Sequence, residues 1–503
     1  MKNKPWVFAF VMVFMAGCLQ PAYPAANDPH TRSTVRPIYV ISDLHFGLGM
    51  ESSSHWDPHE DFRWPRALDG FLKEVNRRET SGADLIIAGD LLELWQHPEN
   101  IRCRNGGNRG CSVEEVTKLA SYVTDQHKEE LASLGTFASS GANHVFVVPG
   151  NHDAATLIPG VWEIVSRMAK AASGRLEFVP SGIWVSEDGI VVVEHGHQIG
   201  SDVNRFQKWP EVTIVDRGRT YLQSPWGERF VQRIFNDEEA RYPIIDNLIP
   251  ESAGARIRLA DRGLWKSTQD VARFIEFNVL QTSWNQKGQA LGNPNAAPNH
   301  TDCDAKALGY KLILYSLPAG DDFRVAAEAD SSDSLALRKA MDARVNRLSE
   351  DETSQLCAAA RSNGNLGALV QAAVTNHEAV MRTHLLNTLG QFPHMQTFVY
   401  AHTHQIESPH AIKLSMTRSV TVANDGAFQR LVSESGFRKR ADALKIPASD
   451  GLARIPLEML PSCYGFVYIP ATAEDRTPRS QFWSMDEKDA SGTVLEVGDP
   501  NCD

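Results

Sequence analysis

The chain has 503 residues, of which 42% are hydrophobic and 22% are charged, and its formal net charge is −12. The length can bury one large core or roughly two to three smaller ones, and the composition argues against a disordered chain or a membrane bundle. The negative charge disfavours a protein that holds nucleic acid on a general basic surface. Nucleotides remain candidate substrates, because a metal centre can supply positive charge locally.

The N-terminus resembles a bacterial export signal over residues 1–26. Two lysines precede an apolar run at 6–17, which is too short to span a bilayer comfortably. The text Met15-Ala16-Gly17-Cys18 resembles a lipobox, so Cys18 is the predicted lipidation site, and Leu19 weakly favours the outer membrane. We therefore expect an exported periplasmic or outer-membrane lipoprotein of a bacterium. The alternative is ordinary signal cleavage near residues 25–26, which would remove Cys18.

The cysteines agree with export. Apart from Cys18 there are six, an even number that suits an oxidising compartment. A metal site is the competing interpretation, but no C-x-x-C spacing occurs, so structural disulfides are favoured. Neighbours in the sequence are the expected pairs: Cys103–Cys111, Cys303–Cys357 and Cys463–Cys502.

From residue 37 to 197, short apolar runs alternate with helical patterns, as in a layered α/β domain. Buried strands are expected at 37–42, 83–88, 144–148 and 189–194. Helices are expected at 66–78 and 113–134.

The pattern changes at about residue 201, after which helical patterns dominate. They cover 226–238, 255–284, 305–317, 334–348 and 366–389, with a turn-rich loop at 292–299. Strand signals return at 397–401, 419–423 and 464–469. We therefore expect one α/β core, residues 35–200 and 393–503, interrupted by a mainly helical insertion at 201–392.

Polar motifs directly follow five of the apolar runs. In open α/β sheets, ligands bind at the carboxyl ends of strands because the loops converge there, so we expect these motifs to meet at one site. They are Asp43-Leu44-His45, Gly89-Asp90, Gly150-Asn151-His152-Asp153, His195-Gly196-His197 and His402-Thr403-His404.

The mixture of carboxylate, amide and imidazole groups suits a pair of metal ions. Two divalent ions about 3.5–4 Å apart can clamp a phosphoryl group and activate a bridging water at neutral pH. Holding two cations so close requires a shared anionic ligand, which one aspartate can supply. Mixed nitrogen and oxygen donors favour Mn, Fe or Zn over Mg or Ca.

In content and order these motifs resemble those of the calcineurin-like metallophosphoesterases. The resemblance covers roughly residues 37–200 and 395–470 and leaves the insertion unmatched. It implies a four-layer α/β/β/α sandwich with mixed sheets and a large helical insertion. It also implies hydrolysis of a phosphoester or pyrophosphate bond by metal-bridged hydroxide, with two divalent ions, Mn²⁺ first and Fe or Zn as alternatives.

The resemblance further implies a role for each motif residue. Three residues would bind the first metal ion: Asp43, His45 and His404. Three would complete the second: Asn151, His195 and His402. Asp90 would bridge both ions. His152, oriented by Asp153, would contact the phosphoryl oxygen and donate a proton to the leaving group, which is typically worth about 10²–10⁴-fold in rate.

Three further residues have two interpretations each. His197 would stand behind the metal ligands or face the substrate, because His195 falls first after the strand. Glu93 occupies a position where one branch of the family has Asp, and a carboxylate that positions the loop is favoured over a ligand. Arg205, close to Lys208, could steer a phosphate or begin the insertion as a solvated charge.

The residues within and around the motifs also indicate which branch of the family the chain resembles. The G-D-x-V-D-R-G and R-G-N-H-E motifs of protein Ser/Thr phosphatases are absent. The stretches 42–47 and 89–95 look closest to the branch of the UDP-2,3-diacylglucosamine hydrolases, which insert a helical lid over a lipid substrate. The expected partners are a phosphorylated small-molecule or lipid substrate and, if Cys18 is modified, a membrane.

Two other functions are weighed against hydrolysis. A non-catalytic surface lipoprotein that keeps the fold as a scaffold should have lost ligands, yet every expected ligand type is present. An exported nuclease or nucleotidase is the other alternative. A nuclease predicts a basic groove, which the acidic balance of the chain disfavours.

Overall fold

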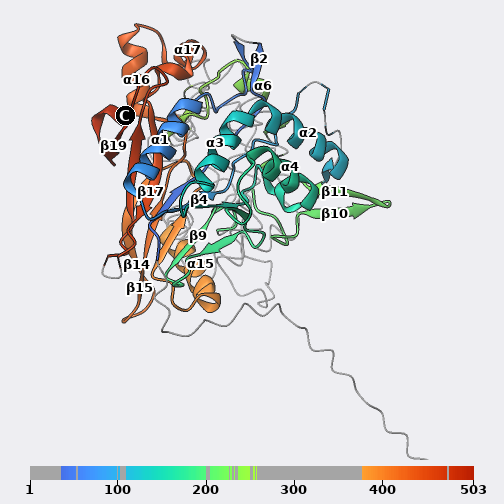
Figure 1. Cartoon of the computed structure of the whole chain (residues 1–503). Helices are drawn as coiled ribbons and strands as arrows, with labels where there is room; N and C mark the ends of the chain where they lie inside the picture. The colour runs from blue at the N-terminus through green and yellow to red at the C-terminus, as the bar shows by residue number, and fades with distance from the viewer. Residues whose placement is uncertain are drawn as a thin grey trace, which may run out of the picture. The chain divides into compact units, whose positions relative to one another are not determined.

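A seven-stranded mixed sheet forms one half of the core in a computed structural model of the chain (Figure 1). β1 (Ile38–Ile41) pairs in parallel with β4 (Asp84–Ala88) and antiparallel with β17 (Cys463–Ile469). All four residues of β1 are buried, as expected for a strand that is covered on both faces. The strands, in spatial order, are β19 (Thr493–Glu496), β18 (Arg479–Ser484), β17 (Cys463–Ile469), β1 (Ile38–Ile41), β4 (Asp84–Ala88), β6 (His144–Val148) and β7 (Leu176–Phe178).

A five-stranded sheet joins segments that are far apart in the sequence. β13 (Thr397–Tyr400) lies parallel to both β9 (Val191–Glu194) and β15 (Ser419–Asn424), so the chain returns to the core after the long stretch that follows β9. The spatial order is β14 (Glu407–Lys413), β15 (Ser419–Asn424), β13 (Thr397–Tyr400), β9 (Val191–Glu194) and β8 (Ile183–Val185).

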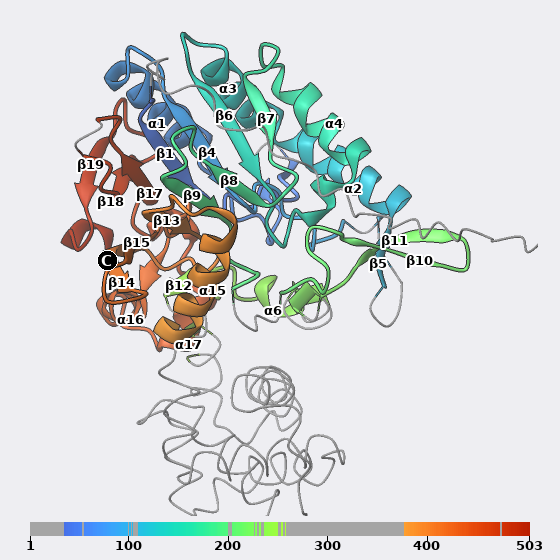
Figure 2. The same cartoon turned by 90° about the horizontal axis from the view of Figure 1, so that it is seen from below.

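The two sheets and their helices make four layers. Apolar side chains of both sheets, among them Val40 and Val399, form one buried cluster between the sheets. The opposite face of the seven-stranded sheet is covered by α1 (Pro65–Arg78), α2 (Val113–Gln126), α3 (Lys128–Ala138) and α4 (Pro159–Ala169). α15 (His377–Gln391) lies beside the five-stranded sheet (Figure 2). Its Met381 and Leu385 side chains pack on the outer face of that sheet. The mixed α/β sandwich predicted from the sequence is confirmed.

The structure describes residues 35–249 and 377–503, apart from short gaps at 53–54, 99, 102, 104–108, 200–203, 226, 229–230, 233–235 and 473–474, together with residues 253, 254 and 257. Several predictions lie outside these residues. They are the signal with Cys18, the helices at 305–317 and 334–348, most of 255–284, the loop at 292–299, and the pair Cys303–Cys357. The division into core and insertion remains a prediction.

The remaining elements of the described residues are short. They are β2 (Met50–Ser52), β3 (His55–Trp56), α6 (Asn236–Glu239), β12 (Leu248–Ile249), β16 (Val432–Ser433), α16 (Glu434–Ala443), α17 (Ala448–Arg454), and 3-10 helices at Ala154–Leu157, Leu457–Met459 and Pro500–Cys502. No helix in the described part of the chain is long and apolar enough to cross a membrane.

The helix predicted at 113–134 is two helices in the structure. α2 begins at a capping box formed by Ser112 and Glu115, and it ends at His127. The His127 ring is buried, with Nε2 3.3 Å from a carboxylate oxygen of Glu60. This contact with a segment far away in the sequence breaks a helical pattern that looks continuous in the sequence.

The stretch predicted as mainly helical begins instead with a hairpin. β10 (Thr213–Asp216) and β11 (Arg219–Gln223) pair antiparallel, and β11 also pairs with β5 (Arg109–Ser112) (Figure 2). Arg217 and Gly218 form the two-residue turn, and both have positive φ, as the favoured hairpin turns require. No helix was predicted at these residues, since the first helix expected in the insertion begins at 226, and strands this short and half-exposed give a weak sequence signal.

Two disulfides lie within the described residues. They join Cys103 to Cys111, with Cα atoms 4.7 Å apart, and Cys463 to Cys502, with Cα atoms 5.6 Å apart. Both pairs were predicted from their proximity in the sequence. The second one fastens the C-terminal turn to β17.

Candidate metal centre

The predicted ligands converge where five strands end. The loops after β1, β4 and β6 leave neighbouring parallel strands of one sheet, and those after β9 and β13 leave neighbouring parallel strands of the other. The two sets of loops meet between the sheets. Seven predicted ligands are brought together there: Asp43, His45, Asp90, Asn151, His195, His402 and His404.

The backbone at this meeting point is unusual. Side chains with a Cβ rarely adopt positive φ, and where they do, the surrounding structure must hold them in place. Here the amide of His45 donates to the Asp90 carbonyl at 2.9 Å, and the amide of Asp43 donates to the Gly89 carbonyl at 3.1 Å. Five of the seven predicted ligands have φ between 50° and 73°: Asp43, His45, Asp90, His402 and His404.

Two positions in the motifs require glycine because a neighbouring side chain comes very close to the backbone there. A Cβ on Gly89, which also has a φ of +95°, would collide with the His195 ring. A Cβ on Gly150 would collide with the Asp90 carboxylate. The glycines of the G-D and G-N-H-D motifs therefore let two pairs of loops pack against each other.

The first group consists of Asp43, His45 and His404. Nε2 of His404 lies 3.3 Å from Asp43 Oδ1, and Nε2 of His45 lies 3.8 Å from the same oxygen. Asp43 Oδ1 and His45 Nε2 are buried and have no hydrogen-bond partner among the described residues. Buried polar atoms are normally hydrogen-bonded. In the part of the chain that the structure describes, Asp43 Oδ1 and His45 Nε2 instead face each other without a hydrogen-bond partner, as expected of two ligands of one cation.

The second group consists of Asp90, His195 and His402, with Asn151 beside them. Nε2 of His195 lies 3.0 Å from Asp90 Oδ2 and 2.9 Å from Asn151 Oδ1. Its other ring nitrogen, Nδ1, lies 2.9 Å from the Ala88 carbonyl oxygen, which can only accept a hydrogen bond. The Nδ1–H therefore donates to Ala88, and the Nε2 lone pair is directed at the group.

Asp90 belongs to both groups. Its Oδ2 lies 3.0 Å from Nε2 of His195 and 3.9 Å from Nε2 of His45, while Oδ1 accepts the His152 amide at 2.8 Å. Burial alone would raise the pKa of the Asp90 carboxyl, but the nearby imidazoles of His195 and His152 hold it well below its usual range. One ionised carboxylate thus reaches both prospective metal positions.

Glu93 links the first group to the predicted acid. Its Oε2 lies 2.5 Å from Nδ1 of His152 and 3.0 Å from Nδ1 of His45, and its Oε1 accepts the Trp95 amide at 2.6 Å. Burial raises the pKa of Glu93, but the charges of His152 and His45 outweigh it and lower the pKa to about 2. Glu93 therefore contacts the backbone of its own loop through Trp95 and also contacts two imidazoles, which agrees with a positioning role.

Asp153 has different contacts from those expected of the residue that orients His152. Its Oδ1 accepts the Gly150 amide at 2.6 Å, and its Oδ2 accepts the Leu91 amide at 2.9 Å. The orienting contact on His152 comes instead from Glu93. Asp153 is buried at the start of a 3-10 helix, so it ties the loops after β4 and β6 together, and burial and the Asp90 charge raise its pKa to about 7.

His152 is more open than the ligand groups beneath it. Its side chain is 18% exposed, whereas the side chains of Asp43 and Asp90 are at most 2% exposed. The ring stacks on Trp95 with centroids 3.8 Å apart and meets His45 edge-on at 4.6 Å. Trp95 was not predicted as a site residue, and its only sequence signal is its position two residues after Glu93.

Neither His197 nor Arg205 belongs to a group of potential metal donors among the described residues. His197 is buried, with its ring 5.4 Å from that of His195 and 4.3 Å from that of Trp209. This burial favours a place behind the ligands over one that faces substrate. Arg205 is exposed and donates to the Gln198 carbonyl at 3.2 Å, so its proposed steering of phosphate stays a prediction.

Three acidic residues close to Glu93 form a group that no sequence motif indicates. Asp61, Glu239 and Asp246 offer oxygens within 4.8 Å of one another. Burial and the neighbouring carboxylates, including that of Glu93, raise the pKa of Asp61 and of Glu239 well above the usual range. The three come from segments that no motif spacing connects, so only the fold reveals them.

Comparison with known proteins agrees with the site. Residues 36–278 match the family model described as calcineurin-like phosphoesterase, and no curated protein matches the chain. The match includes the motifs from Asp43 to His197, and the fold adds His402 and His404 from beyond it. Residues 36–278 therefore correspond to a metallophosphoesterase domain, and that family implies metal-dependent hydrolysis of a phosphoester.

Proposed function

We propose that the chain hydrolyses a phosphoester or pyrophosphate bond at a dinuclear metal centre. The observation that carries the proposal is the position of Asp90 Oδ2, within 3.9 Å of an imidazole nitrogen of each group. The first ion would be held by Asp43, His45 and His404, the second by Asn151, His195 and His402, and both by Asp90. When bound, two such ions supply charge stabilisation for the phosphoryl group and an activated water.

His152 has the surroundings of a general acid. Glu93 accepts from its Nδ1, which leaves Nε2 as the nitrogen that can deliver a proton to the leaving-group oxygen. Trp95 fixes the plane of the ring by stacking on it. The ionised Glu93 carboxylate would stabilise the imidazolium before the proton leaves, in the orienting role that was expected of Asp153.

The finer parts of the proposal rest on the sequence. Mixed imidazole and carboxylate donors support Mn²⁺ first, with Fe or Zn as alternatives. The stretches 42–47 and 89–95 support the branch of UDP-2,3-diacylglucosamine hydrolases, and with it a phosphorylated lipid or small molecule as substrate. The N-terminal sequence supports export and a lipid anchor on Cys18.

Activity assays of the purified chain test this function. With Mn²⁺ present, we expect cleavage of a chromogenic phosphomonoester or phosphodiester, and the ratio between the two would direct the search for the substrate. His152→Ala should keep its bound metal and lose about 10²–10⁴-fold in kcat, because only the proton donor is removed.

The matched control is His410→Ala, which removes an exposed imidazole on β14. It should leave both metal content and rate unchanged. A wild-type chain that binds metal and yet cleaves phosphomonoesters, phosphodiesters and pyrophosphates no faster than His152→Ala would support a scaffold instead.

A further inference from the structure

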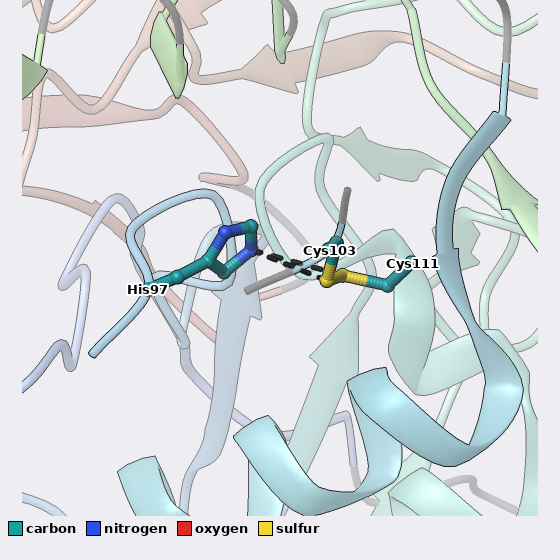
Figure 3. Close-up of side chains that lie close together, drawn as sticks. All are labelled: His97, Cys103 and Cys111. Carbon is teal, nitrogen blue, oxygen red and sulfur yellow. Dashed lines mark hydrogen bonds between the residues drawn. A yellow bond between two sulfur atoms is a disulfide. The ribbon is translucent and has the colours of Figure 1, made fainter. Parts of the chain in front are cut away.

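A further group of potential metal donors lies on the loop that follows β4 and on β5, to which that loop leads. His97 directs its ring nitrogen Nε2 at the disulfide between Cys103 and Cys111 (Figure 3). Nε2 is 3.7 Å from each of the two sulfur atoms. The Cys111 side chain is buried in β5, and His97 and Cys103 are partly buried.

The contact between the His97 ring and the disulfide is weak in itself. A disulfide sulfur is a weak hydrogen-bond acceptor, so an imidazole equidistant from two of them makes a poor interaction. An imidazole and two thiolates, by contrast, are preferred donors for zinc. The three donor atoms also lie within 4.8 Å of one another.

The distances already approach those of a metal site. With Zn–S of about 2.3 Å and Zn–N of about 2.0–2.1 Å, tetrahedral geometry places a nitrogen and a sulfur ligand about 3.6 Å apart and two sulfurs about 3.8 Å apart. The two nitrogen–sulfur distances of 3.7 Å therefore need almost no change. Only the sulfur–sulfur separation must open, which is what reduction permits.

We propose that His97 and the reduced Cys103 and Cys111 form a site for one thiophilic divalent cation such as Zn²⁺. A dithiol reductant supplies two electrons and two protons, which break the sulfur–sulfur bond and give two thiols, while the reductant is oxidised to its own disulfide. Binding of the cation displaces the two thiol protons. Each thiolate and the His97 Nε2 then donate an electron pair, and water takes the fourth position.

The site is chemically distinct from the candidate dinuclear centre. The predicted ligands of that centre offer only nitrogen and oxygen atoms, and none of them is a cysteine. It is nevertheless close to it in sequence, since His97 follows Trp95 by two residues and Trp95 stacks on His152. Either the disulfide or the bound cation would anchor the loop that carries Trp95.

The second described disulfide offers a matched control. Cys463 and Cys502 are also paired, but within the described residues no group of three potential metal donors includes either of them. Reduction there yields two thiols without a converging imidazole, so Cys463→Ser/Cys502→Ser should leave the cation site intact.

Titration with Co²⁺ tests the proposal, because a thiolate ligand gives a near-ultraviolet charge-transfer band that nitrogen and oxygen ligands do not give. The oxidised full-length protein should show no such band. After reduction, the band should saturate with about one Co²⁺ per chain and disappear when Zn²⁺ is added. Cys103→Ser/Cys111→Ser should abolish it.

His97→Ala keeps both cysteines, so it tests whether His97 is a ligand of the cation even if the double variant fails to fold. In the reduced state it should raise the Co²⁺ concentration at half-saturation by about tenfold or more, because one of three protein donors is lost. Circular dichroism would verify the fold of each variant. Two results would overturn the proposal: a folded, reduced wild type without the band, or an affinity that His97→Ala leaves unchanged.

Discussion

At the scale of single residues, the candidate centre is built from conformations that side chains seldom adopt. Asp43, His45 and Asp90 all have positive φ. Their backbones are held by hydrogen bonds between the loops after β1 and β4. Such strain persists only where the surrounding structure enforces it, and it is concentrated at functional sites. The ligand groups are thus preorganised by loop contacts as well as by their own side chains.

Glu93 gives a prediction at this scale, because one carboxylate oxygen serves both His45 and His152. Glu93→Gln replaces that carboxylate with a neutral amide, which can no longer stabilise an imidazolium. We expect a fall of about 10- to 100-fold in kcat, with a smaller change in KM, as is typical for residues that orient catalytic or metal-binding groups.

The split between kcat and KM, measured on protein whose fold circular dichroism has verified, separates this orienting role from a merely structural one. Glu496→Gln is the control, since Glu496 is exposed on β19 and accepts from Gln481 at 2.7 Å. A folded Glu93→Gln enzyme with the wild-type kcat would refute the orienting role.

At the scale of elements, α3 and α4 approach each other closely. A Cβ on Gly135 would collide with the Ala169 carbonyl and lie 3.2 Å from the Ala171 amide, so the two backbones are nearly in contact at this point. Both helices belong to the layer that covers the seven-stranded sheet behind the site. Glycine is required at position 135 because it is the only residue without a Cβ.

Gly135→Ala should therefore destabilise the protein. We expect the free energy of unfolding to fall by about 1–3 kcal/mol, since backbone atoms of α4 must move to accept the methyl group. Gly160→Ala is the matched control within α4, because nothing lies within 4 Å of its added Cβ. Urea denaturation that gives equal midpoints for the two variants would contradict the close packing.

The break between α2 and α3 predicts a pH dependence. Burial lowers the pKa of His127, but the charges of Glu60 and Glu130 outweigh it and raise the pKa to about 9. Because this value lies above the ordinary pKa of about 6.5, the pair stabilises the fold fully below about pH 6.5, and that contribution is lost as the pH rises through about 9. The contribution is at most roughly 3 kcal/mol.

Thermal unfolding of wild type and of His127→Gln checks the sign of this effect. The stability difference between the two proteins should be largest near pH 6 and should shrink towards pH 10. Using the difference removes the effect of other groups that titrate in the same range. A difference that grows with pH would contradict the assignment.

At the scale of the whole molecule, the described core is made from two segments that are distant in the sequence. β1 lies between β4 and β17, and β13 lies between β9 and β15, so neither sheet is complete without the C-terminal segment. The same segment delivers His402 and His404 to the candidate centre. The family match ends at residue 278, and it is the fold that shows the C-terminal strands to be part of the same two sheets.

Much of this core follows from the sequence. The strands after which the motifs fall are mostly buried and rich in β-branched residues, so their positions agree with the structure to within one or two residues. The convergence of the motifs follows from parallel pairing. Side-chain direction does not follow from spacing, which is why Asp153 was assigned the contact that Glu93 makes, and why the acidic trio of Asp61, Glu239 and Asp246 was missed.

The most direct test of the account is the metal content of Asp90→Asn compared with wild type and His404→Ala. We expect about two ions per chain in the wild type, because two donor groups share one carboxylate. Asp90→Asn should lose both ions, since the shared negative charge is removed, whereas His404→Ala should lose only the first. If Asp90→Asn keeps both ions, or loses only one as His404→Ala does, Asp90 is not a bridging ligand and the dinuclear assignment is wrong.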